Sequence, residues 1–125
     1  LGVVPGSMGS PGFIVRGKGN AESFNSCSHG AGRVMSRAAA FRTLKHADMK
    51  KILKEQGISL IGGTLDESPE VYKDINKVID GQRDLVDVLA KFEPKLVRMA
   101  AEGNQWGNKK KKKKPENKGD GDVCM

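Results

Sequence analysis

The sequence of 125 residues is poor in the residue types that build metal centres and disulfide-linked folds. It contains two cysteines and two histidines, and neither a Cys-x-x-Cys nor a His-Glu-x-x-His spacing occurs in it. Cys27 and Cys124 are far apart in the sequence, and Cys124 is the penultimate residue of a polar tail, so we expect no structural disulfide. We therefore predict that no metal site is formed by residues of this chain.

Long hydrophobic runs are also missing. Hydrophobic residues make up 37% of the chain and aromatic residues 5%, and no apolar stretch approaches the length needed to cross a bilayer. We expect no membrane partner and a reducing, cytoplasmic compartment. The chain opens with Leu1-Gly2-Val3-Val4 rather than with Met or a leader, so we expect a fragment of a longer protein.

The net charge of +7 is unevenly distributed. From Asn108 onward the chain carries seven lysines, six of them consecutive at 109–114, against three acidic residues, which leaves only +3 for the rest. Such a segment cannot bury enough apolar area to offset its ordering entropy, so we predict a disordered basic tail at 102–125. The tail is either a solvated segment or a non-specific phosphate-binding arm with a steep salt dependence.

The remaining residues, 1–101, predict one small α+β domain. The apolar spacing predicts strands at 1–4, 12–15 and 58–61, a helix at 37–55 that Gly57 ends, and a second helix from Asp66 to Ile79 with Ser68 as its cap and Pro69 at its first position. The segment 85–101 fits either a helix or a strand pair, and Pro94 breaks it in both cases.

His29 stands in the most informative stretch, because it is followed by Gly30, Ala31, Gly32 and Arg33. Glycines let backbone N–H groups approach an anion, and an arginine neutralises its charge. This pattern favours a phosphate-handling nucleophile. The alternative is a structural histidine beside an ordinary Gly-Ala-Gly turn.

Four segments of the chain resemble the carboxy-terminal third of the RtcB-type RNA ligases. They are Pro5–Gly9, Phe13–Gly17, Glu22–Arg37 and Ser68–Ile75, and the resemblance continues to about Val97. Enzymes of this family join an RNA 3′-phosphate or 2′,3′-cyclic phosphate to a 5′-hydroxyl, using GTP and manganese. The resemblance implies a fold of mixed α/β layers, GTP and Mn²⁺ as cofactors, and RNA ends, with tRNA as one candidate, as substrate.

The same resemblance implies roles for individual residues. His29 matches the histidine that attacks GTP to form a guanylyl-histidine. The residues that match the walls of the guanylate site are Pro5, Gly6, Ser7, Met8, Gly30, Ala31 and Gly32. Tyr72 resembles a tyrosine near the guanine, with a half-buried core tyrosine as the equal alternative.

Arg33 and Arg37 are candidates for contacting the RNA or nucleotide phosphates. If a helix began at His29, both arginines would follow at intervals of four and project on one side as a phosphate clamp. The alternative is a solvated helix face.

Two positions depart from the family pattern. Gly12 stands where a serine or threonine is usual, and Met99 falls where a guanine-contacting lysine is expected. Both departures concern the guanine, so nucleotide selectivity is left open. The family's manganese ligands belong upstream of this chain, so we expect Mn²⁺ to be held by the remainder of the ligase, in cis or in trans, and the isolated chain to be inactive.

Three functions are therefore compared. The first is the guanylate-bearing, carboxy-terminal part of an RNA ligase. The second is a non-catalytic RNA-binding module that uses the lysine tail with Arg33 and Arg37. The third is an inactive truncated fragment. The resemblance implies that this chain forms one wall of an active-site cleft. Without the rest of the protein, that wall exposes the edges of apolar strands, so we expect poor solubility or self-association.

Overall fold

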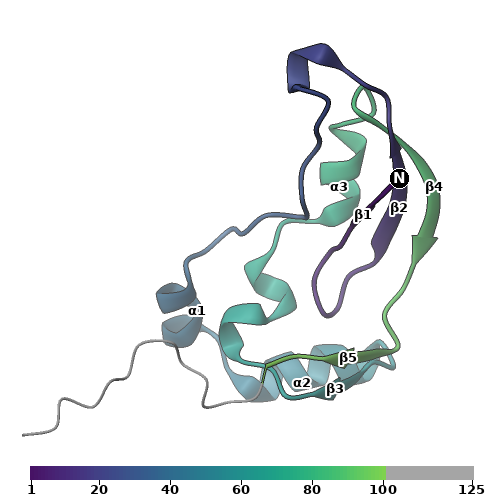
Figure 1. The fold of residues 1–125 in the computed structure, drawn as a ribbon. Coiled ribbons are helices and arrows are strands. Elements are labelled where there is room, and N and C mark those ends of the chain that lie inside the picture. The colour runs from purple at the N-terminus through teal and green to yellow at the C-terminus, as the bar shows by residue number, and fades with distance from the viewer. Residues whose placement is uncertain (101–125) are drawn as a thin grey trace, which may run out of the picture.

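The structure is a computed structural model in which residues 1–100 are described. It consists of short strands and helices, in agreement with the predicted α+β class (Figure 1). We describe it as two layers, each of which is a small sheet with a helix packed against it. The predicted tail, 102–125, lies outside the described residues. No helix within residues 1–100 is long and apolar enough to cross a membrane.

The first layer is a three-stranded antiparallel sheet covered on one face by a helix. Strand β2 (Gly12–Gly17) lies between β1 (Gly2–Val4) and β4 (Val86–Phe92), and helix α3 (Ile75–Asp80) packs beside them (Figure 1). Alternating side chains of the strands meet those of α3 in one core, whose buried members are Val4, Phe13, Val15, Ala31, Ile75, Ile79 and Val86. We call this set the first core.

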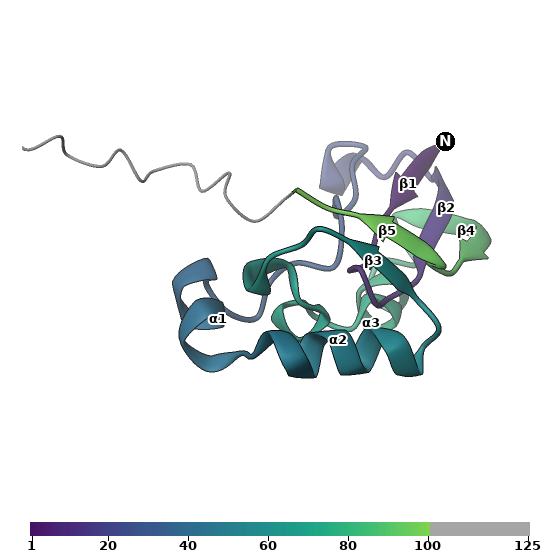
Figure 2. The same cartoon turned by 90° about the horizontal axis from the view of Figure 1, so that it is seen from below.

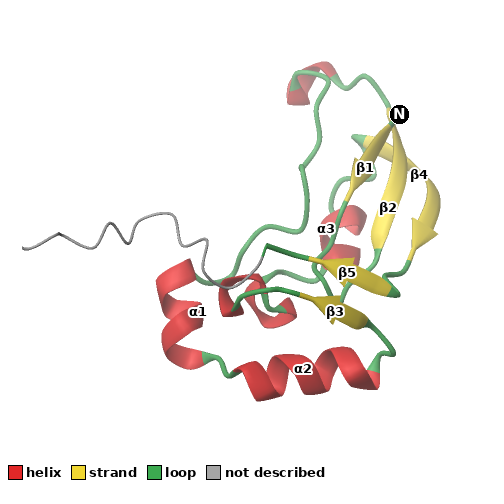
Figure 3. Cartoon of the chain, turned by 60° about the horizontal axis from the view of Figure 1, so that its bottom comes forward, coloured by secondary structure: helices red, strands yellow, loops and turns green. Residues whose placement is uncertain are grey.

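The second layer pairs two short parallel strands over a helix. Strand β3 (Ser59–Ile61) lies beside β5 (Leu96–Arg98), and helix α2 (His46–Glu55) runs along them (Figures 2 and 3). The second core consists of the buried residues Met8, Met49, Leu53 and Ile58. Gly57 follows the helix with φ of +68°, the left-handed conformation that ends helices, so the predicted stop is confirmed.

The predicted helix at 37–55 is wrong in one respect, because the chain breaks it into two. Helix α1 (Arg37–Thr43) ends before Leu44, which is extended, and α2 starts at His46. The Ser36 side chain caps α1 by accepting a hydrogen bond from Ala39 N at 3.1 Å. The break separates a helix that faces Asp66 from a helix that buries Met49 in the second core.

The predicted helix from Asp66 to Ile79 is also largely wrong. Residues 65–71 form two 3-10 turns, η2 (Leu65–Glu67) and η3 (Pro69–Val71), and α3 begins only at Ile75. A residue before proline disfavours the helical conformation, and Ser68 accordingly has ψ of 146°. Ser68 and Pro69 do take the predicted cap and first positions, but those of η3; the cap of α3 is Asp74, whose carboxylate accepts from Asn76 N at 2.9 Å.

The segment from residue 85, which the sequence left open between helix and strand pair, forms strands and no helix as far as residue 100, the last one described. Strands β4 and β5 are separated at Pro94, and they enter different sheets, since β4 pairs with β2 and β5 with β3. The remaining short element is a 3-10 turn, η1 (Ala21–Ser23), ahead of the loop that carries His29.

Candidate functional site

His29 lies in the irregular loop between η1 and α1, with its side chain exposed. The residue before it is held by Gln82, whose side-chain oxygen accepts from Ser28 N at 3.0 Å and whose side-chain nitrogen donates to Ser28 Oγ at 2.8 Å. Cys27, the next residue back, is a half-buried free thiol. The imidazole is thus presented to solvent from an anchored backbone.

The structure brings together the two segments that the resemblance assigned to the guanylate site. A Cβ added at Gly30 would lie 3.1 Å from the carbonyl oxygen of Pro5, so the two backbones are almost in contact. At Gly6 an added Cβ would lie 2.4 Å from the Pro11 oxygen, which excludes any other residue there without a shift of the backbone. Glycine is therefore required where the 5–11 loop folds back on itself.

The side chains of the 5–8 segment are mostly engaged within the protein. Ser7 Oγ lies 2.8 Å from Ser10 Oγ and accepts from Gly9 N at 3.3 Å. Met8 is 4% exposed and belongs to the second core. Any contact of Met8 with a ligand would therefore come from its backbone.

On the other side of His29, the chain is fixed by the first core and by Tyr72 and Lys73, which follow η3. Ala31 is buried in the first core, and Gly32 adopts φ of +77°. The Gly32 carbonyl then accepts from Lys73 N at 2.9 Å, and Arg33 forms an isolated antiparallel bridge with Tyr72. The positive φ at Gly32 is a conformation that side chains disfavour, which explains a glycine at this point.

Arg33 lies over the ring of Tyr72, with its guanidinium carbon 5.4 Å from the ring centroid. Its Nε donates to the Met35 oxygen at 3.2 Å, and one terminal nitrogen lies 3.9 Å from a Glu67 oxygen. The other terminal nitrogen is buried and has no hydrogen-bond partner. Tyr72 itself donates its hydroxyl to Glu67.

Arg37, in the first turn of α1, reaches Glu67 as well and also the carboxylate of Asp66. Its guanidinium pairs with Asp66 and lies 3.1 Å from Glu67 Oε1. Thr64 donates its hydroxyl to the other oxygen of Asp66. Arg33, Arg37, Asp66, Glu67 and Tyr72 therefore form one connected polar group, which we call the arginine cluster.

Burial and charge pairing shift the pKa values of this cluster. Burial of Asp66 alone raises the pKa of its carboxyl group, but the hydrogen bonds from Thr64 and Arg37 outweigh it, so the pKa is lowered. The Asp66 hydrogen bond and charge raise the pKa of Arg37. Burial raises the pKa of the Tyr72 phenol, and the hydrogen bond to Glu67 adds to this effect. The lowered pKa of Asp66 and the raised pKa values of Arg37 and Tyr72 keep Asp66 and Arg37 ionised and Tyr72 neutral at neutral pH.

The predicted geometry of the two arginines is wrong, although they do meet. No helix begins at His29, because residues 29–36 are irregular and Gly32 has a positive φ, so the spacing of four does not place the arginines side by side. They converge because each approaches Glu67, Arg33 from the bridge with Tyr72 and Arg37 from α1.

Sequence reasoning missed three site residues: Asp66, Glu67 and Gln82. The two acidic residues could have been suspected, since an acidic pair directly precedes the Ser68–Ile75 segment. No local signal marks Gln82, because its partner Ser28 is 54 residues away in the sequence.

The positions that depart from the family pattern lie elsewhere in the fold. Gly12 is buried at the start of β2, and Met99 packs against the second core. The Met99 side chain is therefore part of the packing between the second layer's strands and helix.

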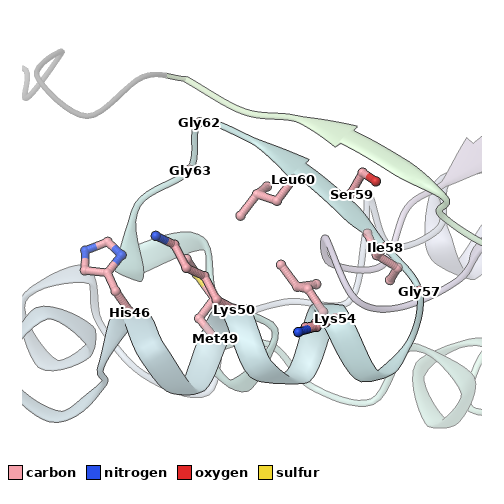
Figure 4. A pocket seen from close by; sticks show the side chains of 11 residues that line it. His46, Met49, Lys50, Lys54, Gly57, Ile58, Ser59, Leu60, Gly62 and Gly63 are labelled. Carbon is pink, nitrogen blue, oxygen red and sulfur yellow. The ribbon is translucent and has the colours of Figure 1, made fainter.

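A cavity of about 730 Å³ lies in the second layer, between α2 and β3 (Figure 4). Its lining includes apolar side chains such as Met49 and Leu60 and basic ones such as Lys50. Neither His29 nor any member of the arginine cluster lines it. Among residues 1–100 no group of three His, Cys, Asp or Glu side chains is placed to hold a metal ion.

Comparison with known proteins finds a matching family and several similar proteins. The family model described as tRNA-splicing ligase RtcB matches residues 1–100. The chain is 49% identical over 88 residues to the RNA-splicing ligase RtcB of Escherichia coli strain K12, which is 70% of this chain and 22% of that protein.

Two archaeal proteins are also similar to this chain. The chain is 36% identical over 103 residues to the tRNA-splicing ligase RtcB of Nanoarchaeum equitans, covering 76% of this chain and 22% of the relative. It is 45% identical over 84 residues to that of Archaeoglobus fulgidus, covering 62% and 17%. The chain thus spans about a fifth of the length of the curated relatives that it matches.

Proposed function

The chain belongs to the RtcB family, and we propose that it is the guanylate-bearing part of a GTP-dependent RNA ligase. The ligase would join RNA 3′-phosphate or 2′,3′-cyclic phosphate ends to 5′-hydroxyl ends, in the cytoplasm and with tRNA among its substrates. One observation carries the proposal: exposed His29 stands on an anchored loop in which Gly30 lies so near the Pro5 segment that an added Cβ would be 3.1 Å from the Pro5 oxygen. These are the two segments that the resemblance assigns to the guanylate.

In the first step, a nitrogen of the His29 imidazole attacks the α-phosphorus of GTP. An N–P bond forms, the bond from the α-phosphorus to its bridging oxygen breaks, and pyrophosphate leaves with the electron pair. The imidazole must be unprotonated at the attacking nitrogen and in line with the leaving group. Exposure of the His29 side chain leaves that approach open.

In the second step, a 3′-phosphate oxygen of the RNA attacks the phosphorus of the guanylyl-histidine. The N–P bond breaks, His29 regains its free nitrogen, and the RNA end carries GMP through a new phosphoanhydride. The 5′-hydroxyl then attacks the activated 3′-phosphate, loses its proton and displaces GMP. The joined RNA has an ordinary phosphodiester.

The anionic reactants need donors that are already in place. The backbone around Gly30 and Gly32 is accessible, and Arg33 retains a buried guanidinium nitrogen with no partner in the protein. That nitrogen is buried, so a phosphate could bond to it only after the Arg33 side chain had moved. Arg37 is already paired with Asp66 and Glu67, so we assign it first to holding the arginine cluster and second to contacting RNA.

Manganese has no fitting site among the described residues. Since residues 1–100 offer no group of three suitable ligands, we assign manganese to the remainder of the ligase. The isolated chain is accordingly proposed to need that remainder, in cis or in trans, for activity.

An RNA-binding module without catalysis is the second candidate, carried by the lysine run at 109–114. It is favoured less, because both of its other predicted contacts, Arg33 and Arg37, approach carboxylates in the fold. A module of this kind would bind RNA with a steep salt dependence and would not depend on His29.

The test is an end-joining assay with an RNA that ends in 3′-phosphate and 5′-hydroxyl groups. The chain is supplied with the remainder of the Escherichia coli relative, outside the segment that it matches, together with GTP and Mn²⁺. We expect joining that needs GTP and is abolished by His29→Ala. RNA binding without joining, unaffected by His29→Ala, would instead establish the second candidate.

A further inference from the structure

We propose that Gln82 is a positioning residue, which holds the backbone of the His29 loop in the place needed for reaction. This role rests on the proposed function of His29. It adds to the site a residue from the turn between α3 and β4, 54 positions from the Ser28 that it contacts.

Burial gives the first reason. Gln82 is 5% exposed, and a primary amide is costly to bury unless both its oxygen and its nitrogen are hydrogen-bonded. Both bonds are made to the same residue: Ser28 N donates to Gln82 Oε1, and Gln82 Nε2 donates to Ser28 Oγ. Two bonds to one residue fix its orientation as well as its position.

The second reason is that Gln82 itself is rigidly placed. Its backbone N–H donates to the Ile79 oxygen at 3.2 Å, and its carbonyl accepts from Leu85 N and Val86 N at 3.0 and 3.1 Å. Ile79 and Val86 are buried members of the first core. Ser28 is therefore tied through Gln82 to the packed part of the first layer.

The third reason is that His29 has an anchor on each side. Gln82 holds Ser28, while Ala31 is buried in the first core and Gly32 accepts from Lys73 N. Only His29 and Gly30 lie between these anchors, and the imidazole points to solvent. A nucleophile that must meet phosphorus in line loses rate steeply when its backbone moves, so the anchors serve the chemistry.

Three substitutions separate the parts of this arrangement. Gln82→Leu keeps the approximate volume and removes both hydrogen bonds. Gln82→Glu keeps an acceptor for Ser28 N, and the Ser28 hydroxyl can rotate to donate to the carboxylate. Ser28→Ala removes the hydroxyl and keeps the backbone bond.

The matched control is Ile58→Val, which removes one methylene group from the second core and lowers the melting temperature without touching the His29 loop. It separates a loss of overall stability from a loss of loop position.

Two readouts are measured on the 125-residue chain and its variants. The first is hydrogen exchange of the Ser28 amide by NMR, on the chain alone. The second is the single-turnover rate of labelling from α-phosphate-labelled GTP, with the remainder of the Escherichia coli relative and Mn²⁺ supplied. We expect Gln82→Leu to speed exchange and to slow labelling, each on the order of tenfold, and Gln82→Glu to restore most of both.

Wild-type exchange and wild-type labelling in Gln82→Leu would overturn the role, as would equal slowing of labelling in Ile58→Val. If the wild-type chain is not labelled at all, the proposed function of His29 fails, while the exchange readout still tests whether Gln82 holds the loop. Should Gln82→Leu fail to fold, Ser28→Ala decides: slower labelling in a folded protein supports the role, and an unchanged rate contradicts it.

Discussion

Gly12 lies directly beneath the ring of Phe92. A Cβ added at Gly12 would come within 2.3 Å of Phe92 Cζ and 2.8 Å of both neighbouring ring carbons. The two residues are opposite each other at the ends of β2 and β4. The ring thus occupies the space where the resemblance implies a serine or threonine side chain.

The first prediction is that positions 12 and 92 are coupled. Gly12→Ser must push the Phe92 ring outward, and we expect a loss of about 1 kcal/mol in the free energy of unfolding. In a Phe92→Ala background the same substitution should cost much less, because the space is then free. Urea denaturation of the wild type, the two single variants and the double variant measures the coupling. An identical cost of Gly12→Ser in both backgrounds would refute it.

The second prediction concerns acid stability through Asp66. Its pKa is lowered in the folded state, so its contribution is present above the unfolded pKa and is lost as the pH falls through the folded pKa. Arg37→Ala removes part of the lowering, so we expect a loss of about 1–2 kcal/mol at pH 7, moderated by the exposure of Arg37, and acid unfolding that begins at a higher pH.

The measurement is the urea midpoint of both proteins at pH 7 and again at a pH below the folded pKa of Asp66, where the difference should close. Arg42→Ala, in the last turn of the same helix, is the control and should change stability by only a few tenths of a kcal/mol. A deficit of Arg37→Ala that is the same at both pH values would contradict the role of Asp66.

The third prediction tests the packing of α2. Leu53 is 2% exposed in the second core, whereas its neighbour Ile52 is only half-buried. Leu53→Ala should lower the free energy of unfolding by about 2–4 kcal/mol, and Ile52→Ala by clearly less. Equal losses in chemical denaturation would mean that the helix is rotated from the orientation described here.

The fourth prediction is self-association through the outer face of the first sheet. Val3, Ile14 and Phe92 are 59%, 39% and 46% exposed, and the strand register places them on one face. We expect the sedimentation coefficient to rise with protein concentration, and Ile14→Lys to suppress the rise. Phe24→Lys, at an isolated site that is 91% exposed, should not suppress it. A monomer at every concentration would exclude this surface.

The strands and the end of α2 were predictable because their signals are local. The apolar residues of 1–4 and 12–15 are bounded by a loop rich in proline and glycine, and Gly57 adopts the left-handed conformation that ends a helix. The α+β class follows from such elements. Their pairing does not, because β4 joins β2 and β5 joins β3 through contacts between distant parts of the chain.

The helices were mispredicted where long-range contacts override local preference. Leu44 is extended although the surrounding apolar spacing continues, and the break lets Arg37 reach Asp66 while Met49 enters the second core. Tyr72 is extended because it bridges Arg33, which no pattern in 66–79 indicates. The signal at Ser68-Pro69 was local, but it marks a 3-10 turn rather than the start of α3.

The candidate site, too, was predictable from the sequence only in part. The resemblance named the Pro5 and Gly30 segments, which lie close together in the fold, whereas Glu67 and Gln82 make tertiary contacts that no local sequence pattern indicates. The role of His29 in guanylylation and the nucleotide preference left open by Gly12 stay predictions.

The central claim is that His29 carries the guanylate. The most direct measurement is labelling with α-phosphate-labelled GTP and Mn²⁺, on the chain supplied with the remainder of the Escherichia coli relative, followed by acid and alkali treatment. His46→Ala is the matched control for His29→Ala. We predict an acid-labile, alkali-stable label that His29→Ala abolishes and His46→Ala retains. Label that persists in His29→Ala, or no label on any variant, would contradict the account.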